Sequence, residues 1–88
     1  MHAPDELILQ RVGAVISETF RVPPGFRIVR ETTSADIEGW DSLSYAVLIM
    51  KMEETFGLDL PLDRVYALAD VGQLADLLRE LEAGKKGS

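Results

Sequence analysis

A single α-helix is indicated by the run Asp41-Ser-Leu-Ser-Tyr-Ala-Val-Leu-Ile-Met-Lys-Met-Glu-Glu-Thr-Phe-Gly57. Asp41 suits the N-cap position, because its carboxylate can accept a hydrogen bond from a backbone N–H group of the first turn. Gly57 suits the position just after a helix, where the backbone often turns left-handed. We therefore expect a helix that begins at Asp41 or Ser42 and ends at Phe56.

This helix has two apolar faces when its residues are placed at about 100° intervals. The bulkier set is expected to enter the core: Tyr45, Leu48, Ile49, Met52 and Phe56. The opposite set, called the outer face below, consists of Leu43, Ala46, Val47 and Met50. Ser42, Glu53 and Glu54 lie on it or beside it. An apolar strip bordered by carboxylates is typical of a partner surface, and the alternative is that residues 21–41 pack over it.

Further helices are expected on both sides of this one. Residues 4–20 carry an apolar stripe at helical spacing: Ile8, Leu9, Val12, Val15, Ile16 and Phe20. Pro4 suits the first turn of that helix, and Val22-Pro-Pro-Gly25 would end it. Residues 21–41 then form a long connection, in which we expect Phe26, Ile28 and Ile37 to contact the core.

After Gly57, Pro61 is expected to open a short helix over residues 62–68, and Asp70 to cap a last helix. The inward stripe of that last helix is Val71, Leu74, Leu77, Leu78 and Leu81. The predicted fold is an all-α four-helix bundle with a short third helix and a long loop between the first two. We expect one domain over residues 1–83 and a disordered tail over residues 84–88.

Composition excludes most catalytic and metal chemistry. The chain of 88 residues has no cysteine and one histidine, His2. Thiol catalysis and cysteine-based metal sites therefore lack their thiols, and a single histidine makes a Ser-His-Asp triad or a histidine-based metal site very hard to assemble. We expect neither an enzyme nor a metal site. The longest apolar run, residues 45–50, is far shorter than the roughly 20 residues that span a bilayer. With no signal-like segment at its start, the chain is expected to be a cytoplasmic monomer that does not bind membranes.

The acidic charge is concentrated in the middle of the sequence. The net charge is -6, and residues 31–63 hold eight acidic side chains against only Lys51. Such a charge repels the phosphates of nucleic acids, which makes DNA or RNA an unfavourable partner. The acidic middle is either a solvated surface or a docking surface for basic proteins.

These residues resemble the acyl carrier protein family. The likeness rests on Gly39-Trp-Asp-Ser-Leu43, on the helix that ends Met52-Glu-Glu-Thr-Phe-Gly57, on Leu60-Pro61 and on Val71-Gly-Gln-Leu-Ala-Asp-Leu-Leu78. It covers about residues 5–82. The resemblance implies that Ser42 is the serine to which a phosphopantetheinyl transferase attaches 4'-phosphopantetheine from coenzyme A. The thiol of that group would carry an acyl or aminoacyl group, in fatty acid, polyketide or related biosynthesis.

The resemblance also implies roles for the neighbouring residues. Asp41 would help the transferase to recognise its target. Leu43, Met50, Glu53 and Glu54 occupy positions where family members meet basic, partly apolar grooves of loading and synthase enzymes, and Ala46 and Val47 belong to the same face. Trp40, Val47 and Lys51 depart from housekeeping fatty acid carriers, and the Gly-Trp-Asp-Ser-Leu form is similar to discrete carriers of specialised pathways. The alternative is an unmodified helical adaptor that binds a basic partner through the outer face.

Overall fold

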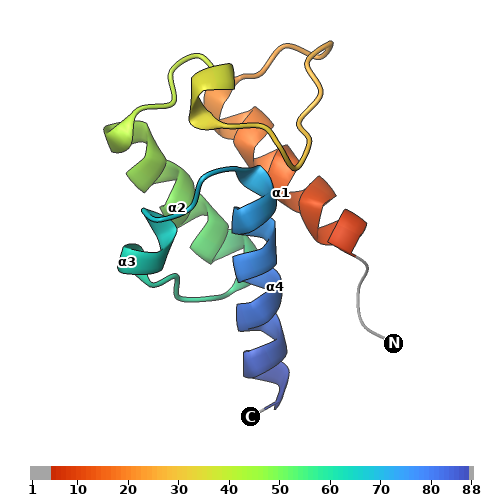
Figure 1. The fold of residues 1–88 in the computed structure, drawn as a ribbon, viewed down its shortest axis with the longest axis vertical. Helices are drawn as coiled ribbons and strands as arrows, with labels where there is room; N and C mark the ends of the chain where they lie inside the picture. The colour runs from red at the N-terminus through yellow and green to blue at the C-terminus, as the bar shows by residue number, and fades with distance from the viewer. Residues whose placement is uncertain (1–4, 88) are drawn as a thin grey trace.

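Four α-helices and one 3₁₀ helix make up the regular structure of residues 5–87, the part of the chain that the computed structural model describes (Figure 1). They are α1 (Asp5–Phe20), the 3₁₀ helix η1 (Ser34–Asp36), α2 (Ser42–Phe56), α3 (Leu62–Val65) and α4 (Val71–Gly87). The predicted all-α bundle with a short third helix is confirmed. The expected helix start at Pro4 lies outside the described residues, and side chains are described for residues 7–84.

The core forms where α1 packs against α2 and α4. The predicted stripes are confirmed by the buried side chains Ile8, Val12 and Ile16 of α1, Leu48, Ile49, Met52 and Phe56 of α2, and Val71, Leu74, Leu77 and Leu78 of α4. Leu9, Val15, Phe20, Tyr45 and Leu81 pack against this core while partly exposed. The periodicity of each helix therefore identified its inward face correctly.

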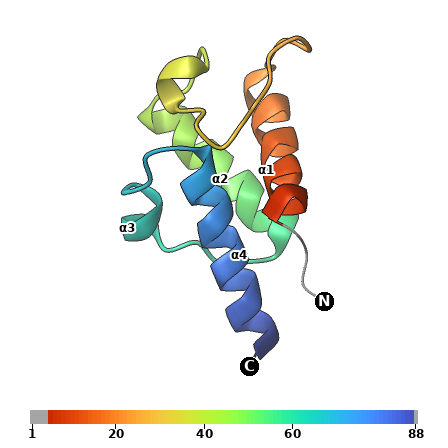
Figure 2. The same cartoon turned by 45° about the vertical axis from the view of Figure 1, so that its right-hand side comes forward.

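The connection between α1 and α2 crosses the end of the bundle at which α2 and α4 begin (Figures 1 and 2). Ile37 is buried and Ile28 packs partly against the core, as expected. The expectation for Phe26 was wrong, since this side chain is 39% exposed. The N–H of Phe26 donates to the carbonyl of Pro23 at 2.9 Å, and this tight turn leaves the ring at the surface.

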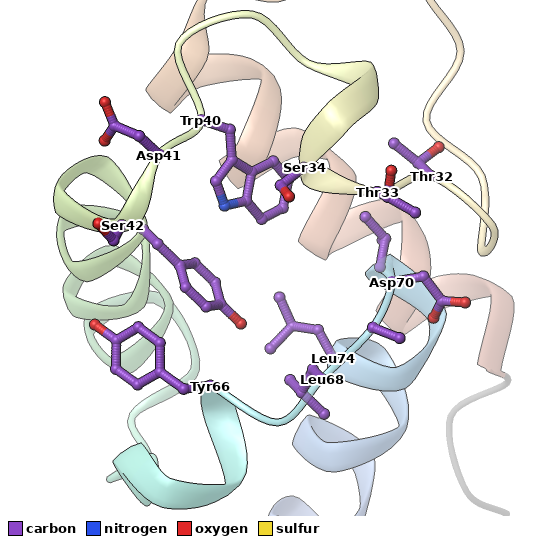
Figure 3. Close-up of a pocket in the computed structure, with 13 residues that line it drawn as sticks. Thr32, Thr33, Ser34, Trp40, Asp41, Ser42, Tyr66, Leu68, Asp70 and Leu74 are labelled. Atoms are coloured by element: carbon purple, nitrogen blue, oxygen red, sulfur yellow. The ribbon is translucent and has the colours of Figure 1, made fainter.

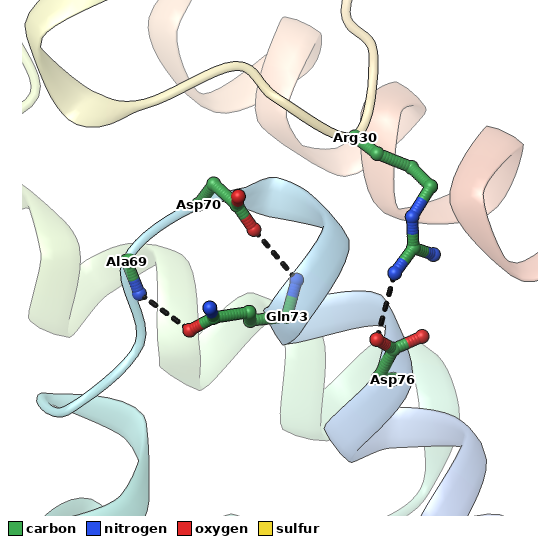
Figure 4. A network of polar contacts seen from close by, with 5 residues as sticks. All are labelled: Arg30, Ala69, Asp70, Gln73 and Asp76. Carbon is green, nitrogen blue, oxygen red and sulfur yellow. Dashed lines mark hydrogen bonds and ion pairs between the residues drawn. The ribbon is translucent and has the colours of Figure 1, made fainter.

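The connection is anchored to the first turn of α4 (Figure 4). The N–H groups of Val71 and Gly72 donate to the carbonyls of Thr32 (2.9 Å) and Arg30 (2.8 Å). Asp70 caps α4 as predicted, because its carboxylate accepts from the N–H of Gln73 at 2.9 Å. The Arg30 guanidinium also donates to the Asp76 carboxylate at 2.7 Å. Backbone donors that a helix start leaves free are thus satisfied by the long loop.

Gly72 is the position at which this anchor is most sensitive to substitution. A Cβ atom there would lie 2.9 Å from the Cβ of Arg30. We expect Gly72→Ala to lower the free energy of unfolding by about 1–3 kcal/mol, because the loop must move away from α4. Urea denaturation measures this change.

Gly84→Ala is the matched control in the same helix, since nothing lies within 4 Å of the Cβ it would add. This substitution should leave stability unchanged or raise it by up to about 1 kcal/mol. Equal effects of the two substitutions would contradict a close contact between the loop and α4.

Helix α3 is shorter than predicted. It ends at Val65 rather than near residue 68, and the N–H groups of Ala67 and Leu68 donate to the carbonyls of Arg64 and Val65, three residues back. The tighter turn carries the chain toward the start of α4. Arg64 and Glu80 join α3 to α4 through two hydrogen bonds of 2.6 and 3.1 Å.

Helix α4 is longer than predicted. It continues to Gly87, where the sequence predicted a disordered tail from residue 84, and Ser88 lies outside the described residues. Ala83, Lys85 and Lys86 are favourable helix residues, and lysines suit the negative end of a helix. This local preference exceeds the cost of Gly84, which had suggested the end of the helix.

Candidate functional site

Ser42 is the first residue of α2, and its side chain is exposed at the end of the bundle that the long loop crosses (Figure 3). In the described part of the chain no group forms a hydrogen bond with its hydroxyl. The backbone N–H groups of the first helical turn give this end of α2 a partial positive charge, which favours a bound phosphate. The Ser42 hydroxyl is therefore exposed to solvent at the positive end of a helix.

Asp41 and Ser44 hold the turn that presents Ser42. The Asp41 carboxylate accepts from the Ser44 N–H at 2.9 Å, and the Asp41 N–H donates to the Ser44 Oγ at 2.8 Å. The Ser44 hydroxyl also donates to the carbonyl of Gly39 at 2.7 Å, and Gly39 has a φ of 88°. The bonds from Ser44, first of all from its backbone N–H, lower the pKa of Asp41 below its usual value of 3.8. Asp41 is thus the predicted N-cap.

The outer face of α2 is open to solvent. Leu43 is 80% exposed, Met50 67% and Val47 45%, and Ala46 beside them is partly exposed. The loop over residues 21–41 therefore does not pack over this face, which was the alternative that the sequence left open. Exposed apolar side chains in a row on one helix are a feature of interaction surfaces.

The two carboxylates at the end of α2 have different environments. Glu54 is exposed beside the outer face. Glu53 is half-buried, and its carboxylate accepts a hydrogen bond from the N–H of Leu60 at 2.9 Å. Glu53 therefore holds the segment after α2 in place, because its carboxylate is used in this internal hydrogen bond.

A cleft of about 280 Å³ opens beside Ser42 (Figure 3). Its walls come from the start of α2, from η1 and the residues before it, from the end of α3 and from the start of α4. Hydroxyl groups of Thr33 and Ser34 lie on one side, and the floor includes Val71 and Leu74. The long loop thus forms one side of an open space next to the exposed serine.

Aromatic rings form the wall of the cleft nearest to Ser42. Trp40 stacks on Phe20 with ring centroids 5.2 Å apart and contacts Tyr45 at 5.7 Å. Tyr45 meets the ring of Tyr66 edge-on at 5.3 Å, and its hydroxyl donates to the carbonyl of Val65 at 2.8 Å. Burial, with a smaller contribution from Tyr66, raises the pKa of Tyr45 to about 12. Trp40 is therefore both an anchor of the loop and a wall of the cleft.

The chain is similar to known proteins over most of its length. Residues 10–78 match the family model described as a phosphopantetheine attachment site. The chain is 34% identical over 82 residues to an acyl carrier protein of Prochlorococcus marinus, which covers 93% of this chain and 96% of that protein. The chain belongs to the acyl carrier protein family. Members of this family are carriers that a phosphopantetheinyl transferase modifies covalently, and they are not catalysts.

Other acyl carrier proteins are similar over most of this chain. A chloroplastic acyl carrier protein of Brassica napus is 30% identical over 78 residues, which are 89% of this chain but 58% of that protein's length. The solution structure of a holo acyl carrier protein from Geobacter metallireducens is 31% identical, covers 91% of each chain and superimposes with a TM-score of 0.81. The helical bundle is therefore the fold of the carrier family.

Two residues of the carrier's site were not identified from the sequence. Ser44 completes the capping box, and the spacing of Asp41 and Ser44 by three residues was the signal for it. Tyr45 was assigned only to the core, and no local pattern shows that its hydroxyl meets Val65, 20 residues away. Among the residues that the structure describes, no cluster of three metal-ligating side chains occurs and no helix is long and apolar enough to cross a membrane.

Proposed function

We propose that Ser42 is the residue that carries 4'-phosphopantetheine, and that the protein holds an acyl or aminoacyl group on it and presents that group to partner enzymes. The observation that carries the proposal is the exposed Ser42 side chain at the first turn of α2, within the matched attachment domain. The cleft beside it leaves room for the attached arm. The arm would tether its cargo and raise the effective concentration of cargo at each partner's active site.

The site residues have distinct parts in this attachment. The Ser42 oxygen forms a bond to the phosphorus that bears the pantetheine portion of coenzyme A. The bond from that phosphorus to the adenosine bisphosphate portion breaks, and the serine proton passes to a base of the transferase. The start of α2 stabilises the new phosphodiester. Asp41 keeps the turn in the conformation that presents Ser42, and its exposed carboxylate is available for recognition by the transferase.

Incubation with coenzyme A, Mg²⁺ and a promiscuous phosphopantetheinyl transferase tests this proposal. Intact-mass measurement should show the gain of one phosphopantetheine group, and peptide mapping should place it on Ser42. No gain with several transferases would contradict the proposal and favour the unmodified adaptor.

The outer face of α2 and Glu54 are proposed as the docking surface for basic grooves of the transferase, the loading enzymes and the synthase enzymes. Leu43, Val47 and Met50 supply exposed apolar contacts, and Glu54 supplies charge at the rim. Such docking is weak and salt-sensitive, because exposed charge pairs contribute little and are screened. Weak docking suits a carrier that must leave each enzyme quickly. We further propose a cytoplasmic monomer that serves a specialised pathway.

Reversal of one rim charge tests the docking surface. Glu54→Lys is expected to raise the KM of the transferase for the protein about three- to tenfold at low salt, with a smaller rise at high salt. Glu54 is preferred to Glu53 for this test, because Glu53 also bonds to the backbone of Leu60. Glu31→Lys makes the same charge change at an exposed site outside α2 and should leave KM unchanged. Equal KM values for both variants would refute docking through α2.

A further inference from the structure

A groove of about 420 Å³, called the α1 groove below, lies between α1 and the first part of the long loop. Four residues of α1 line one side of it: Leu9, Gln10, Gly13 and Ser17. Residues 26–29 of the loop line the other side and pass beside the helix (Figures 1 and 2). Phe26 and Val29 are each 39% exposed. Of the described residues that line the groove, none belongs to α2, so this apolar surface is separate from the outer face.

Gly13 keeps the α1 groove open. Glycine is one of the least favourable residues in the interior of a helix, and Gly13 lies in the middle of α1. Packing does not require it, because a Cβ atom there would lie 3.8 Å from Ile28, which is ordinary contact. A longer side chain at this position would extend into the groove. The fold alone therefore does not account for Gly13, whereas an open groove does.

The loop side of the groove is held in a fixed conformation. The N–H of Val29 donates to the hydroxyl of Thr32 at 2.9 Å, and the N–H of Thr32 donates back to the carbonyl of Val29 at 3.1 Å. Thr32 itself is buried. The turn from Pro23 to Phe26 is closed by the hydrogen bond of 2.9 Å described above. A surface that is ordered before a partner arrives loses little conformational entropy on binding.

The charge of this loop segment is opposite to that of the whole chain. Residues 21–30 contain three arginines and no acidic residue, whereas the net charge of the chain is -6. Arg30 is bonded to Asp76. Arg27 is exposed at the groove, and no ion pair joins it to another described residue. None of the described residues that line the groove is acidic. Arg27 therefore presents an uncompensated positive charge beside exposed apolar side chains.

Apolar contact and positive charge together specify the chemistry of an occupant. A guanidinium group such as that of Arg27 forms its strongest hydrogen bonds with carboxylates and phosphates. A nucleic acid is an unfavourable occupant, because the net charge of -6 repels its phosphates. A basic groove of the kind proposed for the outer face of α2 would be repelled by Arg27. An acidic protein segment that also carries apolar side chains satisfies both requirements.

We propose that the α1 groove binds an acidic, amphipathic segment of a partner protein. Apolar side chains of this segment contact Phe26 and Val29, and one of its carboxylates pairs with Arg27. The proposal goes beyond the attachment at Ser42 and does not depend on it. The carrier then has two docking surfaces of opposite charge, and each repels the partners that suit the other.

Titration of the full nitrogen-15-labelled chain with short synthetic peptides tests this inference. In the acidic probes, leucine and phenylalanine alternate with aspartate and glutamate, and in the matched basic probes lysine replaces every acidic residue. NMR shifts of the backbone amides show where each probe binds. The acidic probes should shift Gly13 and residues 26–29, and their Kd should rise about threefold or more between 0.05 and 0.3 M salt. The basic probes should leave these amides unshifted.

Three results would overturn the inference. The first is an absence of groove shifts with the acidic probes, or equal groove shifts with the basic ones. The second is a set of groove shifts that depends on the concentration of the protein alone, which would identify a second copy of this chain as the occupant. The third is binding to phosphatidylglycerol vesicles without a response to the acidic probes, which would identify an anionic membrane as the occupant.

Reversal of the charge at Arg27 tests the ion pair. Arg27→Glu should raise the Kd of the acidic probes about tenfold, because an attraction becomes a repulsion. Arg21→Glu is the matched control, since Arg21 is exposed in the same loop but lines a different hollow with Asp36 and Glu38. It should change the Kd by less than about twofold at 0.15 M salt. Equal effects of the two substitutions would contradict binding at the groove.

Filling the groove tests its shape without a change of charge. Gly13→Gln should raise the Kd of the acidic probes about tenfold by steric exclusion. The thermal midpoint should stay the same or rise, because glutamine favours a helix more than glycine does. Gly84→Gln is the matched control in α4, where nothing lies within 4 Å of an added Cβ atom, and should leave the Kd unchanged. Unchanged binding by a folded Gly13→Gln protein would refute the groove as the binding site.

Discussion

Ser42→Ala is expected to abolish the gain of a phosphopantetheine group completely. The reaction needs a hydroxyl oxygen as nucleophile, and the other hydroxyl of this turn, on Ser44, donates to Gly39 and accepts from Asp41. The alanine retains the helix start, since the cap is formed by Asp41 and Ser44. Intact-mass measurement after incubation with coenzyme A and the transferase should therefore show the unchanged protein mass, with an unchanged circular dichroism spectrum.

Ser44→Ala is the control for this result. It removes a hydroxyl two residues away and weakens the capping box, but leaves Ser42 in place, so that the protein should still gain one phosphopantetheine group. If Ser42→Ala were modified and Ser44→Ala were not, the attachment would lie on Ser44 and the proposal for Ser42 would be wrong.

Leu48→Ala is expected to destabilise the bundle by about 2–5 kcal/mol. Leu48 is 0% exposed in the core between α1, α2 and α4, so the substitution leaves a cavity as well as losing apolar contact. A domain of this size has only about 3–5 kcal/mol of stability from its core. Much of the variant should therefore be unfolded at room temperature, as measured by urea denaturation followed by circular dichroism.

Leu43→Ala makes the same chemical change on the opposite face of the same helix. Leu43 is 80% exposed, and its removal should change stability by no more than about 0.5 kcal/mol. If Leu43 belongs to the docking surface, this variant is instead expected to raise the KM of the transferase. Similar losses of stability in the two variants would contradict the assignment of separate inner and outer faces to α2.

Much of the helical architecture was predictable because its signals are local. The cap at Asp41, the left-handed Gly57 after α2, with φ 65°, and the spacing of apolar side chains act within a few residues. The motif around Ser42, which resembles the carrier family, also spans only a few residues. By contrast, the extents of α3 and α4 were misjudged by a few residues, since helix ends depend on small differences between competing turns.

The roles of several side chains could not be predicted, because they depend on contacts between distant segments. Glu53 was expected only at a docking surface, yet its carboxylate holds the N–H of Leu60. Phe26 was expected to contact the core, yet a turn at Pro23 places it at the surface. Arg30 and Asp76, 46 residues apart, meet where the long loop contacts α4. The spacing of residues along the sequence does not predict such contacts.

The amino-acid sequence by itself determined where the main helices lie and which face of each enters the core, because short-range hydrogen bonding and 3.6-residue periodicity control these features. The proposed attachment at Ser42 came instead from the resemblance of its motif to the carrier family. Only the tertiary structure decided that the outer face of α2 is uncovered, and that a cleft lined by Trp40 and Tyr45 lies beside Ser42. Both depend on the path of residues 21–41 across the bundle. That path is established by hydrogen bonds from the start of α4 to carbonyls about 40 residues earlier in the chain.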